Sequence, residues 1–538
     1  MTPYDAEDFT TAESDVLRRY FTNLDQPVFA LVNLPEVVKG ALFARYSRSP
    51  KSLRRLFLEE FVDDLDISGD ETVDATVGLR RAEELYDRVF FQYGDDSVAQ
   101  LGGVHLACEQ ASNLLTKVLE WGRIMSYLEQ STRYIRYDER LGGRYRFYRD
   151  PDILNSVHGT RYVGEIDRMF DTYSSLIPVM EQFYKNAVPK KTTDADIAYR
   201  MAIRAKALDS IRGLLPAASL SNVGIYGSGQ AYEALLVRMR SSALPEARTY
   251  SDLMLRELRK VIPSFLKRVD LPDRGDVTAN YMSDNASAVQ ELSDRLLDVT
   301  SAEPAQESTV DLVDFDPDAE IKLVTAMLYP TTSVGERELV EQVRKMTVDE
   351  RLSVMKAYVG DRRNRRHRPG RALERVDYRF DILGDYGAFR DLQRHRMLTI
   401  EWQPLSARHG YVMPDVIEQV RKTAQFSDVM ERSAGLYEAL IDDFPAQAPY
   451  GVALGYRMRY SMQMNARSAM HILELRSAPQ GHPTYRSVAQ DMHRLIAERA
   501  GHRAVAEMMK YVDHAPEETL ERLNAENRAA DRTGAPKA

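Results

Sequence analysis

The feature that most constrains how this 538-residue chain can fold is an internal repeat. Residues 119–138 read LEWGRIMSYLEQSTRYIRYD, and residues 392–415 read LQRHRMLTIEWQPLSARHGYVMPD. Each stretch carries a basic or formerly basic triplet and then Ser-x-Arg. Further on, SNVGIYGSGQAYEALLVRMRS at 221–241 corresponds to GYRMRYSMQMNARSAMHILELRS at 455–477. The repeat predicts two diverged copies of one fold, packed as a pseudo-dimer with binding sites in the clefts between them.

The spacing of the repeat and the composition between its copies define the expected domains. The first domain covers residues 1–267 and the second covers residues 321–514. Between them, residues 268–320 are acidic and poor in aromatic residues, which indicates a linker with room for one short helix. Residues 515–538 form a polar tail. The first copy is longer after its Ser-x-Arg, so we expect an insertion near residues 140–200.

Composition excludes several classes of protein. Hydrophobic residues make up 44% of the chain and charged residues 28%, which is ordinary for a folded soluble protein. The formal net charge of −9 disfavours non-specific binding to nucleic acid or to a membrane surface. No apolar run approaches the ~18 residues of a membrane-spanning helix, and the acidic start MTPYDAEDFTTAESD is unlike a signal peptide. We expect a cytoplasmic protein.

The chain has one cysteine, Cys108, which excludes an intrachain disulfide and any cysteine-rich metal site. No metal site is expected. Around it, helical spacing relates Leu101, His105, Cys108, Ser112 and Leu115. We expect a helix there, with a buried and inert thiol rather than a nucleophile. His105 on the same stripe is expected to be a core histidine rather than a ligand.

The triplet Arg394, His395 and Arg396 points to an anionic ligand, because adjacent cations repel and folding alone gains little from them. RDLQ before the triplet and MLTI after it predict a helix end that passes into a strand. The two arginines reach one ligand only if the backbone leaves the helix there, or if two ligands are held. Ser406 and Arg408 would share one face of a strand. A hydroxyl beside a guanidinium suits a phosphate.

The segment NARSAMHILELR, residues 465–476, predicts a helix with one buried stripe. That stripe consists of Ala466, Ala469, Met470 and Leu473. Asn465 and Arg476 flank it on one edge, while Arg467 and His471 point elsewhere. Polar groups on both borders of a buried face suit a ligand cleft or a subunit seam. The alternative is ordinary salt bridging to Glu474 and its neighbours.

Together these pieces resemble the flavin-dependent thymidylate synthases, which carry RHR followed by Ser-x-Arg, with N-x-R, His and Arg on a later helix. In the first copy EQSTRY, residues 129–134, matches the family's E-x-S-x-R-Y segment. The resemblance covers about 75–260 and 355–500. It implies an α/β fold of the α+β type, with two tandem copies of the synthase fold, mixed or antiparallel sheets and long helices.

The resemblance also implies a reaction: methyl transfer to C5 of dUMP, with FAD as cofactor and NADPH and methylenetetrahydrofolate as co-substrates. Thymidylate synthases of the other type need a cysteine that adds to the uracil ring, whereas this family does not. An arginine stabilises negative charge on the pyrimidine, and the flavin supplies the redox step. The family assigns the catalytic role to Arg476. It assigns FAD binding to Arg394, His395, Arg396, Asn465, Arg467 and His471, and the nucleotide's phosphate and sugar to Glu129, Ser131 and Arg133 or to Ser406 and Arg408.

Each copy departs from the family's pattern in a different place. In the first copy the triplet is Trp121, Gly122 and Arg123, and the later helix offers Ser228 and Gln230. In the second copy Ser406 lies two residues further from the triplet than usual. The expected glutamate is Pro404, the expected glutamine before the triplet is Asp391, and the expected tyrosine after Arg408 is His409. The first copy therefore keeps the nucleotide signature and the second keeps the flavin signature.

Division of labour is the simplest interpretation, with one copy supplying nucleotide contacts and the other flavin contacts to a composite site. The family builds its sites across a tetramer, so two of these chains would form an equivalent four-domain assembly, a homodimer. The alternatives are a flavin enzyme for another pyrimidine nucleotide, or a non-catalytic flavin- or nucleotide-binding paralogue. Nucleic-acid binding and membrane binding are not expected.

One further motif stays open. Residues 361–374, DRRNRRHRPGRALE, carry six arginines and read either as an anion site for flavin phosphates or a folate glutamate tail, or as a solvated basic loop. The second R-H-R there, Arg366 to Arg368, lacks a following Ser-x-Arg. The glycines of GIYGSG, 224–229, precede the degenerate flavin helix, so a Rossmann interpretation is rejected.

Overall fold

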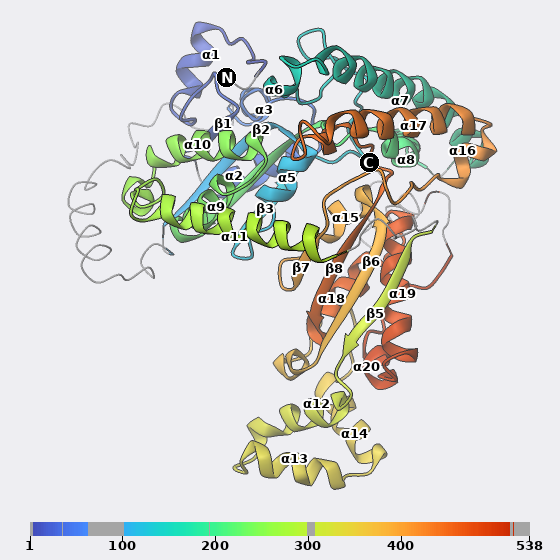
Figure 1. Cartoon of the computed structure of the whole chain (residues 1–538). Helices are drawn as coiled ribbons and strands as arrows, with labels where there is room; N and C mark the ends of the chain where they lie inside the picture. Colours follow the sequence, from blue (N-terminus) through green and yellow to red (C-terminus); the bar gives the residue numbers. More distant parts are fainter. Residues whose placement is uncertain are drawn as a thin grey trace. The chain divides into compact units, whose positions relative to one another are not determined.

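The computed structural model describes residues 4–34, 36–62, 102–192, 194–297 and 307–516, together with residues 100 and 520. Its strands form two antiparallel four-stranded sheets (Figure 1). The strand order is β1-β2-β4-β3 in the first sheet and β5-β6-β8-β7 in the second. The same order recurs, because β5 to β8 stand where β1 to β4 stand in the first sheet. This recurrence confirms the predicted tandem copies and the α/β class.

The strands and helices occupy the following positions. The strands are β1 (Val28–Leu31), β2 (Gly103–Ser112), β3 (Met125–Glu129), β4 (Leu220–Ser228), β5 (Thr309–Phe315), β6 (Asp377–Asp385), β7 (Thr399–Trp402) and β8 (Arg457–Asn465). The helices before β5 are α1 (Thr11–Leu17), α2 (Glu36–Tyr46), α3 (Leu53–Glu60), α5 (Asn113–Leu119), α6 (Pro151–Leu154), α7 (Gly159–Ala187), α8 (Asp196–Ile211), α9 (Gly229–Arg240), α10 (Pro245–Arg259) and α11 (Gly275–Leu296). Those after β5 are α12 (Ala319–Leu328), α13 (Glu336–Lys345), α14 (Val348–Val359), α15 (Tyr386–Leu392), α16 (Asp415–Gln419), α17 (Thr423–Leu440), α18 (Ala466–Arg476), α19 (Pro483–Glu498) and α20 (Arg503–Met508). Short 3-10 helices include η3 (Arg212–Leu214), η6 (Arg371–Arg375) and η7 (Ala448–Gly451).

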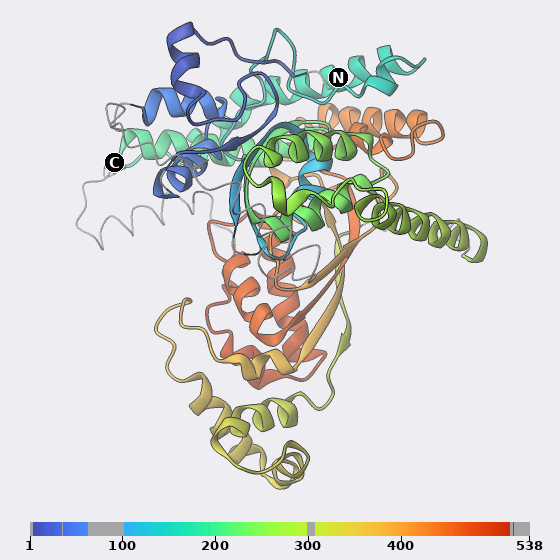
Figure 2. The same ribbon diagram turned by 90° about the vertical axis from the view of Figure 1, so that its left-hand side faces the viewer.

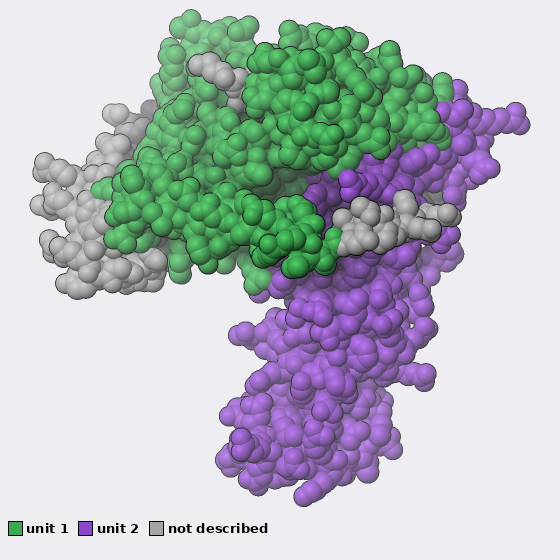
Figure 3. Space-filling view, viewed as in Figure 1, with its two compact units in different colours: residues 1–175, 214–303, 425–453 green, residues 176–213, 304–424, 454–538 purple. Residues whose placement is uncertain are grey.

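The chain divides into two compact units, and each contains a segment from the other copy (Figure 3). Unit 1 consists of residues 1–175, 214–303 and 425–453. Unit 2 consists of residues 176–213, 304–424 and 454–538. Helix α8 from the first copy thus belongs to the unit of the second sheet, and η7 from the second copy belongs to the unit of the first sheet. The predicted boundaries at 267 and 320 do not describe this exchange.

Within unit 1, the first sheet is covered on both faces. Helices α2 and α3 pack against one face, where Phe43 and Phe57 join Phe29 and Ala107 in a buried cluster. Helix α10 packs on β1 and β2, and its Tyr250 hydroxyl donates to the Glu109 carbonyl at 2.6 Å. Because both faces are covered, all four residues of β1 are buried.

Strand β2 corrects one expectation, since residues around Cys108 form a strand and not a helix. Four consecutive residues, 106–109, are buried, so the alternation typical of a half-exposed strand is absent and the sequence mimics a helical stripe. Cys108 is fully buried, which confirms the buried thiol, and burial raises the pKa of the thiol above the usual range. His105 packs against the ring of Tyr226 at 4.5 Å between centroids.

Within unit 2, α18 and α19 lie against the second sheet, and α12, α13 and α14 form a separate helical cluster at one end of it (Figures 1 and 2). The segment predicted as a linker contributes to both units. It contains the 22-residue helix α11, and its strand β5 pairs with β6. The predicted tail, 515–538, lies mostly outside the described residues. The helices of the described residues include no segment with the length and hydrophobicity that a bilayer-spanning helix needs.

Candidate functional site

The triplet of the second copy lies in the turn between α15 and β7, as the sequence predicts. Helix α15 begins at an N-cap, Asp385, whose carboxylate accepts from the Ala388 amide at 2.9 Å, and it ends at Leu392. Beyond it the backbone leaves the helix, which is the condition under which Arg394 and Arg396 can reach one ligand. Arg394 is exposed, while His395 and Arg396 are half-buried. The imidazole is thus flanked in sequence by one exposed and one half-buried arginine.

His395 is held by the arginine at the end of α18. The Arg476 Nε donates to His395 Nε2 at 2.8 Å. Because a guanidinium has no acceptor, His395 Nε2 must be the unprotonated nitrogen of a neutral ring. The pKa of His395 lies well below its usual value, first because the ring is buried and then because of the positive charge of Arg476. The pair therefore presents a neutral imidazole beside a fixed cation.

A series of ion pairs connects Arg476 to two residues of the first copy. Asp391 lies 3.8 Å from Arg476 and 3.5 Å from Arg212, and Arg212 lies 3.6 Å from Asp209. Arg212 and Asp209 belong to the first copy, and they lie at this site because residues 176–213 are part of unit 2. Neither residue is among those that the sequence motifs single out. The only local signal was the Asp-x-x-Arg spacing at the end of α8, which is typical of an ion pair on one helix.

His471 extends the site along α18. Its ring centroid lies 5.8 Å from that of His395, and its Nδ1 lies 3.5 Å from an Nη of Arg368. The pKa of His471 is lowered, first by burial and then by the charges of Arg368 and Arg365. The Arg-rich stretch that contains the second R-H-R thus lies next to α18, and this position agrees with the anion site that is one of the two interpretations of its sequence.

Helix α18 has the predicted buried stripe, and its other polar residues hold the local structure together. Ala466, Ala469, Met470 and Leu473 are all buried, which confirms that expectation. Asn465 is the N-cap and accepts from the Ser468 amide at 2.9 Å.

The Arg467 guanidinium binds two groups of its own unit. It donates to the Pro369 carbonyl at 3.0 Å and to Glu374 at 3.1 Å. A ligand that used this guanidinium would share it with Glu374.

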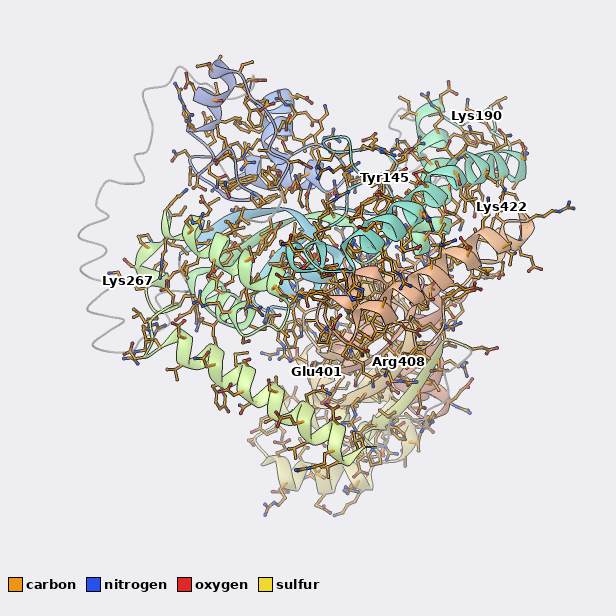
Figure 4. All side chains as sticks on the ribbon, turned by 45° about the horizontal axis from the view of Figure 1, so that its top comes forward. Tyr145, Lys190, Lys267, Glu401, Arg408 and Lys422 are labelled. Atoms are coloured by element: carbon orange, nitrogen blue, oxygen red, sulfur yellow. The ribbon has the colours of Figure 1, made fainter. Side chains whose placement is uncertain are left out.

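Ser406 and Arg408 do not share a strand face, which corrects another expectation. Strand β7 ends at Trp402, and Pro404 has no amide hydrogen with which to continue the ladder. Ser406 and Arg408 lie in the turn that follows, where the Arg408 amide donates to Ser406 Oγ at 3.4 Å. Figure 4 labels Arg408 in this turn and Glu401 in β7.

In unit 1 the nucleotide-type motif begins at the end of β3. Glu129 is buried, and its carboxylate lies 3.2 Å from Lys117 Nζ, which also pairs with Glu120 at 2.7 Å. The Ser131 hydroxyl accepts from the Arg133 amide at 3.3 Å. Glu129 therefore has Lys117 as a partner, and the turn from Ser131 to Arg133, with both of these side chains half-buried, follows the end of β3.

The first copy lacks the His395–Arg476 pair. Gly122 stands at the middle of its triplet, and a Cβ there would come within 2.5 Å of the Tyr127 hydroxyl. Arg238 of α9 lies over the Trp121 ring at 4.9 Å. Counted from the N-caps Ser228 and Asn465, Met239 occupies the position of Arg476.

The second-copy site suits an anionic, planar ligand. Its cations include Arg365, Arg368, Arg394, Arg396 and Arg476. Asp391 lies 3.8 Å from Arg476 and 3.5 Å from Arg212, and both distances are longer than those of a strong charge-assisted hydrogen bond. The Asp391 carboxylate therefore neutralises the charge of Arg476 only in part. The fixed cation, the neutral imidazoles and the flanking arginines fit a flavin dinucleotide, with its conjugated ring and pyrophosphate, and a nucleotide beside it.

Comparison with known proteins finds the same family in both copies of the repeat. The family model described as thymidylate synthase complementing protein matches residues 42–264 and 311–501. A UPF0159 protein of Chlamydia muridarum is 39% identical over 525 residues, covering 97% of this chain and 98% of that protein. A UPF0159 protein of Thermoplasma acidophilum is 30% identical over 523 residues, covering 92% of this chain and 99% of that protein. A flavin-dependent thymidylate synthase of Geobacter sulfurreducens is 28% identical over 193 residues, covering 34% of this chain and 78% of that protein.

Proposed function

The chain belongs to the thymidylate synthase complementing protein family as two fused copies, and from this premise we propose that it is a flavin-dependent thymidylate synthase. The proposed reaction is methyl transfer to C5 of dUMP, with methylenetetrahydrofolate as carbon donor and NADPH as reductant. The Geobacter sulfurreducens relative carries that activity in its name. Bound FAD would supply the hydride chemistry.

The observation that carries the proposal is the pair formed by Arg476 and His395. Arg476 has a side chain 14% exposed, held at Nε by a neutral imidazole. A positioned cation in a partly dry site stabilises an anion that develops beside it, without reorganisation during the reaction. Negative charge on the uracil ring, which makes C5 nucleophilic, is such an anion. The role of Arg476 is therefore to stabilise the pyrimidine anion.

The flanking residues would hold the cofactor. His395 and His471 present edges of neutral rings, and Arg394 and Arg396 supply charge at the surface of the same turn. Asn465 and Arg467 border this region on α18, with Arg467 also bound to Glu374. Ser131 and Arg133 in unit 1, or Ser406 and Arg408 in unit 2, would bind the phosphate and sugar of the nucleotide.

We extend the proposal to assembly. Since the first copy has Gly122 and Met239 at the positions of His395 and Arg476, only the second copy would form a working flavin site. The first copy would supply nucleotide contacts. Two chains would then give a homodimer equivalent to a four-domain assembly.

The test is product analysis with purified protein under anaerobic conditions. The protein is incubated with FAD, NADPH, dUMP and methylenetetrahydrofolate carrying a ¹³C-labelled methylene group, and nucleotides are identified by mass spectrometry. The account expects dTMP with one ¹³C atom in its methyl group. An FAD-containing protein that leaves dUMP unchanged would contradict it.

A second candidate is a related enzyme that modifies another pyrimidine nucleotide. The altered turn after β7 favours it, because Pro404 replaces the family's glutamate and Ser406 lies further from the triplet. The same assay with dCMP in place of dUMP tests this candidate. A ¹³C-labelled 5-methyl-dCMP, or a ¹³C-labelled hydroxymethyl nucleotide from either substrate, would select it.

A further inference from the structure

The segment between α14 and the first residue of η6 is strongly basic, and the proposed reaction assigns no role to its arginines. Residues 361–371, DRRNRRHRPGR, contain six arginines. A solvated basic loop is the simplest explanation for such a run. Two observations argue against a solvated loop here. The backbone of the loop is held at both ends, and only some of its arginines have a carboxylate partner.

The loop is fixed at both ends. Near its start, Arg362 has a side chain 3% exposed and donates to both oxygens of buried Glu474, at 2.5 Å and 2.7 Å. The Arg362 Nε also donates to the His367 carbonyl at 2.7 Å, which closes the loop on itself. Near its end, Arg467 donates to the Pro369 carbonyl at 3.0 Å. The loop is therefore built onto α18, the helix that carries His471 and Arg476.

The arginines fall into two classes. Three have a carboxylate partner: Arg362 pairs with Glu474, Arg363 lies 3.8 Å from Asp361 and Arg371 lies 3.0 Å from Glu374. The other three are Arg365, Arg366 and Arg368. Among the residues that the structure describes, no carboxylate oxygen lies within 4.0 Å of their guanidinium groups.

One of these three contacts the candidate site, and a second lies near enough for its charge to act on it. An Nη of Arg368 lies 3.5 Å from His471 Nδ1, and the charges of both Arg368 and Arg365 act on the His471 ring. His471 in turn lies beside His395. Two guanidiniums without carboxylates, next to a polar ring in a fixed loop, suit a ligand that carries more than one negative charge. Guanidinium forks match phosphate oxygens in geometry.

We infer that Arg365 and Arg368, together with His471, form a subsite for the pyrophosphate bridge of a dinucleotide. The inference rests on the proposed function, in which two dinucleotides, FAD and NADPH, visit this site. Both molecules contain a pyrophosphate bridge. The subsite is therefore assigned to this group, and the experiments below determine which of the two molecules supplies it. Arg362 has a different role: through its pair with Glu474 it positions the loop, and it does not contact the ligand.

The first experiment uses inorganic pyrophosphate as the probe and needs no turnover. Thermal shift titrations compare the wild-type protein with the double variant Arg365→Gln, Arg368→Gln. The matched control is Arg363→Gln, Arg371→Gln, which removes the same charge from the same loop at side chains 83% and 84% exposed. We expect the double variant to weaken pyrophosphate binding at least tenfold, and the control by less than twofold. Equal weakening in both, or none in either, overturns the inference.

The second experiment identifies the source of the bridge. Affinities for FAD, riboflavin and NADPH are measured by fluorescence for the same three proteins. A tenfold loss for FAD, with riboflavin unchanged, assigns the subsite to the flavin cofactor. A tenfold loss for NADPH alone assigns it to the reductant, and no loss for either overturns the inference.

These readouts separate the inference from the proposed function. Selective loss of pyrophosphate binding in a protein that makes no dTMP would keep the subsite and reject the synthase. A protein that makes dTMP while the double variant binds pyrophosphate and both dinucleotides normally would keep the synthase and reject the subsite.

Discussion

At the scale of single residues, the account depends on the charge state of His395. Burial and the neighbouring Arg476 both disfavour its protonated form. Asp391 acts in the opposite direction but ranks last among the causes. The ring is therefore a hydrogen-bond acceptor at Nε2 at neutral pH, and Arg476 is the cation of the pair.

The charge state of His395 can be tested directly. Arg476→Gln removes the nearest positive charge, so we expect the pKa of His395 to rise towards its usual value. The measurement is a pH titration of ¹⁵N-labelled imidazole by NMR. Arg379→Gln is the control, because Arg379 pairs with Asp314 on strands β5 and β6. A wild-type His395 that titrates near pH 6.5, as an unperturbed histidine does, would contradict this account.

The roles of the site residues give a second residue-scale prediction. Arg476→Ala should lower kcat by about 100-fold or more, the usual cost of removing a stabilising group from a developing anion, while the protein keeps its FAD. Arg394→Ala and His395→Ala should instead lose FAD. The measurements are the flavin absorbance of the purified variants and their rate of dTMP formation. Unchanged flavin occupancy in both of the latter variants would refute the assignment.

At the scale of elements, the buried pair of Arg362 and Glu474 connects the Arg-rich loop to α18. Arg362→Ala leaves the Glu474 carboxylate without its bidentate partner, so we expect a loss of about 3 kcal/mol in the free energy of unfolding. The double variant Arg362→Met, Glu474→Leu should lose less, because it removes both charges. The measurement is urea unfolding followed by circular dichroism.

The control for this pair is Arg371→Ala, because the Arg371 side chain is 84% exposed and loss of its pair with Glu374 should cost under about 1 kcal/mol. If Arg362→Ala is no more destabilising than Arg371→Ala, the loop is not anchored by this pair.

Elements also show where sequence reasoning succeeded and where it failed. Local patterns predicted the end of α15, strand β7 and the buried stripe of α18, because each depends on a few adjacent residues. Strand β2 was missed because both of its faces are buried, which removes the alternation. The Ser406 to Arg408 turn was missed because the effect of Pro404 on the strand was not considered.

At the scale of the whole chain, the exchange of segments between the two copies was beyond local patterns. Arg212 lies 179 positions before Asp391 in the sequence, and no pattern connects them. The same exchange brings Tyr450 into unit 1, where its hydroxyl donates to Glu246 at 2.7 Å. Ser112 donates to the same carboxyl from its amide at 2.9 Å and from its hydroxyl at 2.5 Å.

This buried carboxyl makes stability depend on pH. Burial raises the pKa of Glu246 from 4.5 to about 7, despite the donors that oppose the shift. The folded chain therefore keeps a proton that the unfolded chain releases, so the contribution is complete below pH 4.5 and is lost as the pH rises to 7. For Glu246 alone the change is up to about 3 kcal/mol. Glu246→Gln should flatten stability over this range.

The measurement is urea unfolding at pH 5, 6 and 7. Asp252→Asn serves as the control, since Asp252 is 64% exposed and pairs with Arg240 at the surface. The same loss of stability in wild type and Glu246→Gln between pH 5 and pH 7 would show that another group is responsible.

The central claim is that each chain has one flavin site, built by the second copy with Arg476, His395 and His471. The most direct test is the ratio of FAD to polypeptide after saturation and removal of free flavin, measured by absorbance and quantitative amino-acid analysis. The account predicts one FAD per chain in the wild type and in a Gln230→Ala variant of the first copy, and none in His395→Ala. Two FAD per chain, or one FAD that survives in His395→Ala, would contradict it.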